Sequence, residues 1–249
     1  MNRRLIWRML IVCQSIGLLA AFPLLGQEDF LDESDLFDEE FESEPTISDP
    51  LEGLNRSIFK FNDFVYLKLL GPLAKGYHDL TPDPIENGFS NFFDNLKYPI
   101  RFTSNLLQGK VKEAIHETGN FLVNSTVGFA GFHKASDDFF GPDPPVEDFG
   151  QVLGSWGVGE GFYFVIPFLG PSNGRDLLGR FWDRAAHPVL EPWTFVDDST
   201  DRTIYGVVDF VTDSPELMYR YQLLTEAAID PYEAMKHGFT QYRLQQIKE

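Results

Sequence analysis

The sequence predicts a mainly α-helical fold, built as one domain that is interrupted by a loop region rich in glycine and proline. Apolar residues make up 43% of the 249 residues, which is enough for a sizeable core. After Pro50, apolar residues recur mainly three and four positions apart, as they do along one face of a helix. Glycine and proline concentrate in residues 128–174, where they exclude long helices.

Residues 1–26 have the three parts of a signal peptide. Arginines precede an apolar stretch from Met9 to Phe22, and Pro23 and the small Gly26 follow it. The stretch is shorter than the roughly 20 apolar residues that span a bilayer, so a cleaved signal is favoured over an uncleaved anchor. No second apolar run is long enough, so we expect no spanning helix after the signal is removed.

Residues 27–48 form an acidic segment without a single basic residue, in a chain whose formal net charge is −18. Closely spaced like charges repel and extend a chain, which predicts a disordered linker. The phenylalanines in this segment leave a second interpretation open, a short motif that docks on a basic groove. The acidic balance of the whole chain argues against a nucleic-acid partner, because binding phosphates requires a basic face.

Helix-start signals and apolar spacing predict the helices of the first half. Asp49-Pro50 is a cap followed by a first-turn proline, and the apolar positions after it continue at helical spacing to Val65. A second helix is predicted over 85–96. One or two more are predicted over 100–129, with a break at Gly109.

The second half begins with an expected helix after Arg175. Ser214-Pro215 and Asp230-Pro231 each combine a cap residue with a proline, so they predict two further helix starts. The folded domain is expected to span 49–243, and 244–249 are expected to be a short tail.

An uncharged apolar run, 162–169, lies within the glycine- and proline-rich region. It is too short to span a bilayer and has glycines on both sides. These features suit either a buried hairpin or a hairpin that dips into one membrane leaflet, and the residues themselves favour neither.

Residues 170–174 fit the G-x-S-x-G pattern of serine hydrolases, with Ser172 as the nucleophile. The acids and the histidine of such a site follow in the usual order, as Asp197, Asp198, Asp209 and His237. In those enzymes, however, the pattern caps a strand of a parallel sheet, whereas the preceding residues here predict helices. Pro171 also lacks a backbone donor, so a simple turn is favoured and a serine hydrolase remains the alternative function.

No metal or cofactor site is expected. Cys13 is the one cysteine, which excludes an intramolecular disulfide, and the five histidines are dispersed without the spacing of metal ligands.

Several longer motifs resemble the MlaA/VacJ family of outer-membrane lipoproteins. The first is Asp49-Pro50-Leu51-Glu52-Gly53-Leu54-Asn55-Arg56. The most specific is Pro167-Phe168-Leu169-Gly170-Pro171-Ser172 with Arg175-Asp176, and Asp230-Pro231-Tyr232 matches near the end. The likeness runs from about residue 49 to residue 243.

The resemblance implies a ring of helices that lies in the inner leaflet of a Gram-negative outer membrane and associates with porin trimers. Members of the family are thought to withdraw misplaced phospholipid from the outer leaflet through an amphipathic channel and to pass it to a periplasmic lipid-carrier protein. The implied partners are therefore phospholipid, the outer membrane, a porin trimer and that carrier. The resemblance implies neither catalysis nor a cofactor.

Three groups of residues are assigned from the resemblance and from local apolarity. Lipid or membrane contact is expected at Phe162, Phe164, Val165, Ile166, Phe168, Leu169, Phe89, Phe92 and Phe93. The gate or wall of the channel is expected at Leu51, Asn55, Phe59 and Asn62. The matching motifs contain structural positions at Asp49, Pro50, Pro167, Gly170, Pro171, Arg175 and Asp176.

One departure from the family concerns its lipid anchor. Family members usually carry an acylated cysteine after the signal, whereas Gln27 follows Gly26 here, and Cys13 lies inside the predicted signal. We therefore expect a protein without acylation on the periplasmic face of the outer membrane. Its own apolar surface and a porin partner are expected to hold it there.

Overall fold

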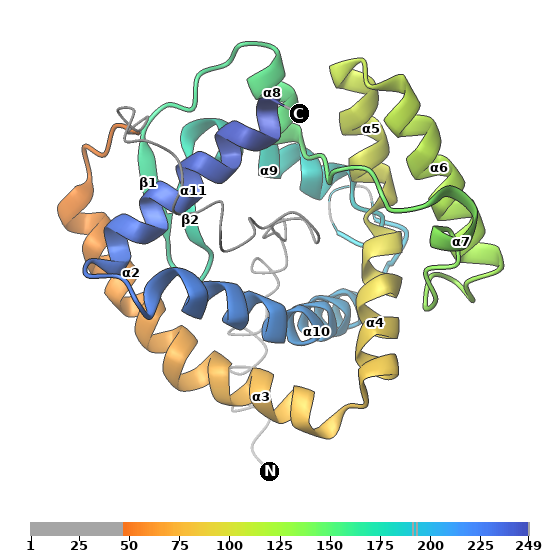
Figure 1. Ribbon diagram of the computed structural model, residues 1–249, viewed down its shortest axis with the longest axis horizontal. Helices are drawn as coiled ribbons and strands as arrows, with labels where there is room; N and C mark the ends of the chain where they lie inside the picture. Colours follow the sequence, from red (N-terminus) through yellow and green to blue (C-terminus); the bar gives the residue numbers. More distant parts are fainter. Residues whose placement is uncertain (1–46, 191, 193, 249) are drawn as a thin grey trace.

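The computed structural model describes residues 47–190, 192 and 194–248, and its helices form a ring (Figure 1). The predicted signal peptide and nearly all of the acidic linker lie outside the described residues. The elements are α2 (Glu52–Val65), η2 (Tyr66–Leu70), α3 (Gly71–Leu80), α4 (Asp83–Leu96), α5 (Tyr98–Gln108), α6 (Val111–Thr126), α7 (Asp137–Phe140), α8 (Phe149–Ser155), β1 (Tyr163–Ile166), β2 (Gly170–Asn173), α9 (Gly174–Ala186), α10 (Ser199–Thr225) and α11 (Pro231–Lys248). The predicted mainly α fold is confirmed, and no described helix has the length and apolarity that crossing a membrane requires.

Helices α2 and α3 form one continuous arc through the π-helical segment η2 (Figure 1). Pro72 explains the wider turn, because it has no backbone N–H to donate to the preceding turn. Gly71 allows a close approach there, since a Cβ at this position would lie 3.3 Å from the carbonyl oxygen of Tyr66. The first helix thus starts near the predicted position but continues well beyond Val65.

Helices α4, α5 and α6 form the opposite side of the ring (Figure 1). The break predicted at Gly109 is confirmed. Gly109 follows α5 with a φ of +78°, a left-handed conformation that glycine adopts without strain. The next N–H, that of Lys110, donates to the carbonyl oxygen of Asn105 at 2.9 Å and closes the end of α5.

The helix start predicted at Ser214-Pro215 is wrong, because α10 runs unbroken through both residues. Pro215 cannot donate to the carbonyl oxygen of Val211, which lies four residues earlier. The hydroxyl of Ser214 donates to that oxygen instead, at 2.7 Å. A side chain therefore replaces the missing backbone hydrogen bond inside the helix.

The start predicted at Asp230-Pro231 is confirmed, because α11 begins at Pro231. This helix continues to Lys248, so residues 244–248 belong to it and do not form the separate tail that was expected.

Residues 128–174 hold only short elements, as the sequence predicts: α7, α8 and the hairpin of β1 and β2. The two strands pair antiparallel, with Tyr163 opposite Asn173 and Ile166 opposite Gly170. The N–H of Tyr163 also donates to the carbonyl oxygen of Ser48 at 2.8 Å, which attaches the start of the described chain to the hairpin.

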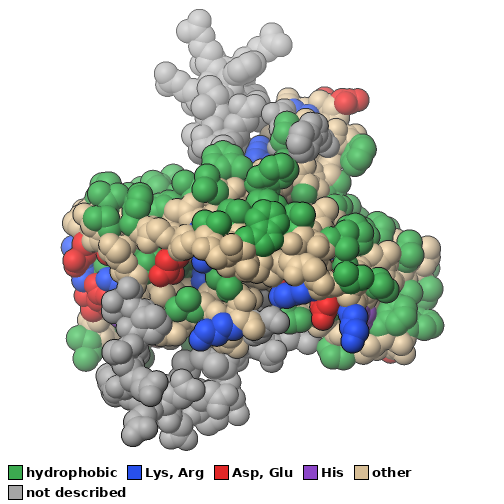
Figure 2. Space-filling view, turned by 90° about the horizontal axis from the view of Figure 1, so that it is seen from above, with side chains coloured by type: hydrophobic (Ala, Val, Ile, Leu, Met, Phe, Trp, Pro, Cys, Tyr) green, Lys and Arg blue, Asp and Glu red, His purple; other side chains and the backbone are tan. Residues whose placement is uncertain are grey.

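The hydrophobic core lies on one side of the ring, where α2, η2, the hairpin, α10 and α11 meet. Its buried members are Ile47, Phe59, Tyr66, Leu70, Ala74, Tyr163, Val165, Met218, Tyr221, Tyr232 and Met235. Many other large apolar side chains point outward instead, on α2 to α6 and on α9. Figure 2 shows hydrophobic side chains gathered along the edge of the ring that faces the viewer, mostly to one side of the charged ones.

Candidate functional site

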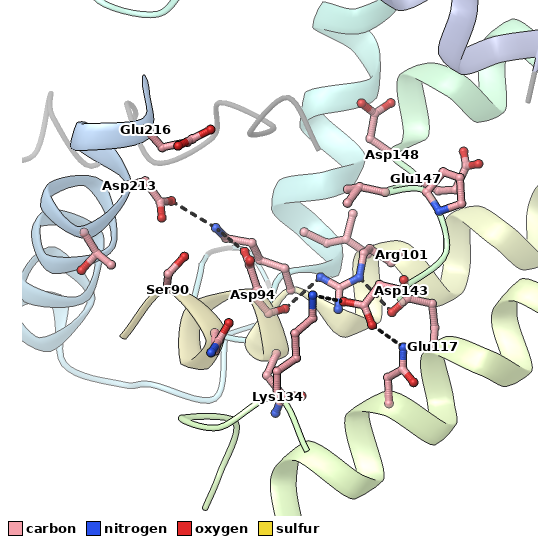
Figure 3. A pocket seen from close by; sticks show the side chains of 18 of the residues that line it. Ser90, Asp94, Arg101, Glu117, Lys134, Asp143, Glu147, Asp148, Asp213 and Glu216 are labelled. Atoms are coloured by element: carbon pink, nitrogen blue, oxygen red, sulfur yellow. Dashed lines mark hydrogen bonds and ion pairs between the residues drawn. The ribbon is translucent and has the colours of Figure 1, made fainter. Parts of the chain in front are cut away.

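A polar cavity of about 850 Å³ lies within the ring, on the side of α4, α5 and α6 (Figure 3). Side chains of α9, α10 and α11 and the loop 142–148 complete its lining. The inward faces of α4 and α6 are polar because Asn91, Asp94 and Asn95, and Glu117, Asn120 and Asn124, recur at helical spacing.

The lining of this cavity is predominantly acidic. Nine carboxylates contribute, namely Glu86, Asp94, Glu117, Asp143, Glu147, Asp148, Asp183, Asp213 and Glu216. Five lysines and arginines oppose them, namely Lys97, Arg101, Lys134, Arg184 and Arg220. Fixed charges of both signs in one wall suit a polar or zwitterionic molecule better than an apolar one.

Lys97 contacts three carboxylates on the α4–α10 side of the cavity. Its ammonium group lies 3.4 Å from a carboxylate oxygen of each of Asp94, Asp209 and Asp213. Burial favours the neutral amine, but the three carboxylates outweigh it and raise the pKa of Lys97 well above its usual range. Burial raises the pKa of Asp213 to about 7, although Lys97 opposes that shift.

Two further ion pairs hold the cavity wall on the α5–α6 side. Arg101 donates to the buried Glu117 at 2.9 Å and to the carbonyl oxygen of Asp94 at 2.8 Å. Lys110 donates to Glu147, which also accepts from Gln108. Both carboxylates are buried, and burial raises the pKa of each despite its cationic partner.

His187 lies at the α9 end of the cavity and is uncharged. Burial, together with the nearby Lys97 and Arg184, lowers the pKa of His187 to about 3. Its Nδ1 accepts from the N–H of Val189 at 3.1 Å, and its Nε2 lies 3.0 Å from the hydroxyl of Tyr205. This histidine therefore stabilises the wall as a neutral imidazole and does not take up a second proton at neutral pH.

A second, smaller cavity of about 80 Å³ lies between α2, the hairpin, α9, α10 and α11. Its lining is mainly apolar and includes Phe59, Tyr66, Leu217, Leu224, Met235 and Phe239. Asp148, Asp183, Arg220, Tyr242 and Gln246 line both cavities. The two cavities are thus adjacent, with mainly polar and charged residues between them.

A buried ion cluster closes the ring between α8, α9 and α11. The guanidinium of Arg243 donates to Asp148 at 2.7 Å and to Asp176 at 2.7 Å. Asp176 also accepts from the side chain of Asn173, which caps α9. Gly150 leaves room for this cluster, because a Cβ there would lie 2.6 Å from a guanidinium nitrogen of Arg243.

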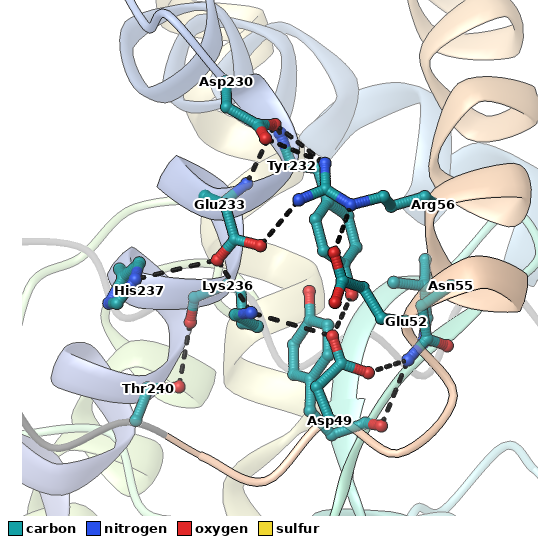
Figure 4. Close-up of polar contacts among 12 residues, drawn as sticks. Asp49, Glu52, Asn55, Arg56, Asp230, Tyr232, Glu233, Lys236, His237 and Thr240 are labelled. Atoms are coloured by element: carbon teal, nitrogen blue, oxygen red, sulfur yellow. Dashed lines mark hydrogen bonds and ion pairs between the residues drawn. The ribbon is translucent and has the colours of Figure 1, made fainter.

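The start of the described chain meets the start of α11 in a polar cluster that we call the terminal clasp (Figure 4). It comprises Asp49, Glu52, Asn55, Arg56, Asp230, Tyr232, Glu233 and Lys236. Arg56 donates to Asp230 and Glu233, each at 2.8 Å, and lies 4.4 Å above the ring of Tyr232. The hydroxyl of Tyr232 donates to Asp49.

Two of the four predicted gate residues attach α2 to the hairpin. Asn55 donates to the carbonyl oxygen of Tyr163 at 3.2 Å and accepts from the N–H of Val165 at 3.0 Å. Asn62 donates to Ile166 at 2.9 Å and accepts from the N–H of Phe168 at 2.7 Å. An asparagine amide can satisfy a donor and an acceptor of one strand at once, which explains these two positions.

The other two predicted gate residues lie in different environments. Phe59 is buried in the core and lines the apolar cavity, whereas Leu51 is exposed just before α2. None of the four predicted gate residues lines the polar cavity in the described part of the chain.

The residues predicted to contact lipid divide by exposure. Phe162 and Phe168 are 46% and 42% exposed, and Phe164, Ile166, Leu169, Phe89 and Phe92 are partly exposed. Val165 and Phe93 are each only 4% exposed and belong to the protein interior, so the expected lipid contact is wrong for these two side chains. Phe89 and Phe92 pack against Phe132.

The hairpin combines both interpretations that the sequence left open. One face is buried through Tyr163 and Val165, whereas the tip presents Phe168 to the surface. Phe168 has a φ of +65°, and its carbonyl oxygen accepts from the hydroxyl of Tyr66 at 2.6 Å. Such a conformation is unfavourable for a bulky residue, so the bonds from Asn62 and Tyr66 hold the tip in place.

The predicted structural positions lie in three of these features. Asp49 belongs to the terminal clasp, with Pro50 directly after it, and Asp176 belongs to the buried ion cluster, where Arg175 contacts it at 3.2 Å. Pro167, Gly170 and Pro171 form the turn and the first residues of β2, and Gly170 has a φ of +80°.

The proposed hydrolase nucleophile is inaccessible. Ser172 lies in β2 with 0% of its surface exposed. Among the described residues, its hydroxyl has no hydrogen-bond partner, and His237 contacts Glu233 instead. The expected turn is confirmed only in part, because the segment 170–173 is the second strand of the hairpin.

The sequence interpretation missed the cavity lining altogether. Its members follow a regular pattern, as in Asp94, Lys97 and Arg101 or in Arg180, Arg184 and His187. These polar stripes at helical spacing are the available signal, but spacing alone does not say which face of a helix points inward.

Comparison with known proteins gives a consistent result. The family model described as the MlaA lipoprotein matches residues 47–246. A relative in Haemophilus influenzae, "Intermembrane phospholipid transport system lipoprotein MlaA", is 31% identical over 205 residues, which cover 78% of this chain and 77% of the relative. A protein of the same description in Shigella flexneri is 32% identical and covers 78% of this chain and 76% of its own.

A solved structure matches the fold with a TM-score of 0.68 at 28% sequence identity. The match covers 80% of this chain and 99% of the other chain. The description of that structure reads "Structural basis for maintenance of bacterial outer membrane lipid asymmetry".

Proposed function

The chain belongs to the MlaA lipoprotein family, and from this membership we propose that it removes misplaced phospholipid from the outer leaflet of the outer membrane. In this proposal the lipid passes through the ring and is handed to a periplasmic carrier, which maintains lipid asymmetry. The resemblance inferred from the sequence motifs is confirmed. The relatives named for intermembrane phospholipid transport support this function.

The observation that carries the proposal is the reversed polarity of the ring. Large apolar side chains lie on its outer surface, whereas charged and amide side chains line its inner cavity. Moving two acyl chains of about 30 methylenes through water would cost on the order of 24 kcal/mol. A transporter therefore has to keep the tails in apolar surroundings while the headgroup stays in polar ones, and this ring offers both.

We propose no catalytic role for Ser172, in contrast to the hydrolase alternative. A nucleophile has to reach its substrate, and the burial of Ser172 in β2 prevents this. Ser172→Ala is expected to leave outer-membrane barrier function intact, and loss of that function with a folded variant would restore the hydrolase interpretation.

The proposed location is the outer membrane, with the ring in the inner leaflet at the periplasmic face. The exposed apolar residues support contact with lipid or with a porin trimer, which we propose as the partner in the membrane. The periplasmic carrier is proposed because phospholipid cannot cross the aqueous periplasm unshielded.

We propose that retention does not depend on an acyl chain, because Gln27 stands where family members carry the acylated cysteine. The intact mass of the exported protein tests this. A mass without a lipid adduct is expected, and a diacylglycerol adduct would contradict the proposal.

Deletion of the gene tests the function itself. Phospholipid is expected to accumulate on the cell exterior, where an added phospholipase or a headgroup-reactive reagent detects it. Expression of the full chain should restore the asymmetric membrane, and an unchanged cell surface in the deletion strain would refute phospholipid removal.

A further inference from the structure

Arg184 differs from the other cationic residues of the polar cavity. Among the described residues, Lys97, Arg101, Lys134 and Arg220 each form an ion pair with a carboxylate. The guanidinium of Arg184 forms none in this part of the chain, although it lines the cavity and is only partly exposed. A guanidinium without a carboxylate partner is available to bind a phosphate, for which its fork of donors is well suited.

Helix α9 connects this arginine to the apolar cavity. Arg180 lines the apolar cavity, Asp183 lines both cavities, and Arg184 and His187 line the polar one. Because Arg180 and Arg184 are one helical turn apart, the two cavities follow each other along the same face of α9. A ligand bound to Arg184 therefore lies close to the entrance of the apolar cavity.

The charge balance of the polar cavity restricts which lipid headgroup can bind there. Nine carboxylates face five lysines and arginines in the lining, and Lys97 already contacts three carboxylates, two of them in the lining. Lys110 and Arg243, which lie outside the lining, pair with Glu147 and Asp148, so the carboxylates still outnumber these cations by two. An anionic headgroup would add negative charge to this surplus. A headgroup with an ammonium group, by contrast, brings one positive charge for its phosphate and leaves the balance unchanged.

From this arrangement we propose that a zwitterionic phospholipid binds where the two cavities meet. Its phosphate lies on Arg184, its ammonium group faces the surplus carboxylates, and part of one acyl chain enters the apolar cavity. The proposal rests on the transport function proposed above and adds the lipid class that the ring prefers. The apolar cavity, at about 80 Å³, holds only a short stretch of chain, since a cavity of about 150 Å³ binds a molecule no larger than benzene.

The test uses the purified full chain in detergent micelles that contain equal amounts of phosphatidylethanolamine and phosphatidylglycerol. Native mass spectrometry counts the lipids that stay bound. We expect phosphatidylethanolamine to exceed phosphatidylglycerol several-fold on the unaltered protein. Arg184→Gln should lower bound phosphatidylethanolamine about tenfold, because a charge-assisted contact is lost. Arg184→Lys should retain part of the binding.

Two control variants, Lys75→Gln and Leu223→Trp, separate binding at this site from effects of charge loss or added bulk elsewhere. Lys75→Gln removes an exposed charge on α3 that lies outside both cavity linings, and it should leave lipid binding unchanged. Leu224→Trp should fill the apolar cavity and lower binding, whereas Leu223→Trp, at an exposed neighbouring position, should not. Thermal unfolding of each variant shows whether it is folded, and Arg184→Met serves as a second neutral variant if Arg184→Gln is not.

Inorganic phosphate alone tests whether the site binds any phosphate group or specifically the phosphate of a lipid. It should bind at least a hundredfold more weakly than the phospholipid, because it gains nothing from the apolar cavity. Equal affinity would identify a simple anion site and overturn the proposal. Equal binding of both lipids, or unchanged binding by folded Arg184→Gln, would also overturn it. If the unaltered folded protein binds no phospholipid at all, the transport function fails as well.

Discussion

The two sides of the ring are stabilised in different ways. Where α2, the hairpin, α10 and α11 meet, apolar side chains such as Phe59, Tyr163 and Met235 form an ordinary core. Where α4, α5 and α6 enclose the cavity, the buried residues are mainly polar, such as Asn105, Glu117 and Asn120. Many of the apolar side chains on this second side lie on its outer surface, including Ile115 and Leu122.

Only one side of the molecule therefore folds around a dry core. The cavity side has to keep a wide polar space open, so its shape depends on ion pairs and amide hydrogen bonds. When one partner of an ion pair is removed on the dry side, little water can reach the charge that remains. Beside the cavity, water can hydrate the remaining charge. The largest mutational effect is therefore expected at Arg243, which is 4% exposed and does not line the polar cavity, although its partner Asp148 does.

Arg243→Ala is expected to have the largest effect on stability. It removes the guanidinium that the buried Asp148 and Asp176 share, although Asp176 keeps its contact with Arg175 at 3.2 Å. The free energy of unfolding should fall by about 3–5 kcal/mol, as measured by thermal or denaturant unfolding in detergent. A loss below about 1 kcal/mol would show that water reaches this cluster and would remove the contrast between the two sides.

Arg101→Ala is the matching change on the cavity side. Arg101 pairs with the buried Glu117 at 2.9 Å, but it lines the water-accessible cavity. We expect a loss of about 1–3 kcal/mol, smaller than that for Arg243→Ala, because water can hydrate the remaining carboxylate. An equal or larger loss than for Arg243→Ala would contradict the proposed difference.

The sequence predicted the helices well because apolar spacing and breakers such as Gly109 are local signals. It did not predict which face of each helix points inward. In an ordinary globular protein the apolar stripe faces the core, but on α5 and α6 residues such as Leu106 and Ile115 are exposed and the polar stripe faces the cavity. Only the environment of the whole ring, and not any one helix, decides between these orientations.

The motif residues illustrate a second limit of local signals. Asn55 and Asn62 are spaced for one face of α2, which the sequence shows, but their partners lie more than 100 residues later in the hairpin. Similarly, Asp49 and Tyr232 meet in the terminal clasp from opposite ends of the domain. Such positions were recognisable as part of a family pattern, whereas their roles in attaching the hairpin and closing the ring required the fold.

The acidic side chains around Lys97 make the stability of the cavity side depend on pH. Asp213 faces Lys97, Asp209 and Asp94, and burial raises its pKa to about 7. The folded protein therefore retains a proton that the unfolded chain releases near pH 4. The stabilisation that this proton provides is complete below about pH 4, decreases as the pH rises to about 7, and is lost above pH 7.

Asp213→Asn is expected to flatten this pH dependence, because asparagine cannot ionise. Melting temperatures between pH 5 and pH 8 should fall for the unaltered protein and fall less for the variant. Burial also raises the pKa of Asp209, so part of the slope should remain. Parallel curves for both proteins would show that Asp213 ionises as freely in the folded ring as in the unfolded chain.

The smallest effect on stability is expected at the hairpin tip, where Phe168 combines a φ of +65° with partial exposure. Phe168→Asn replaces a bulky residue by one that tolerates this conformation, which offsets the lost contact with the ring of Phe61 at 5.0 Å. The free energy of unfolding should change by less than about 1 kcal/mol, whereas binding to vesicles should weaken, because an apolar side chain leaves the surface. The neighbouring exposed Lys60→Asn, in the middle of α2, is the control and should not weaken binding. If Phe168→Asn destabilises the fold strongly while vesicle binding persists, the tip belongs to the core side of the ring and not to its membrane surface.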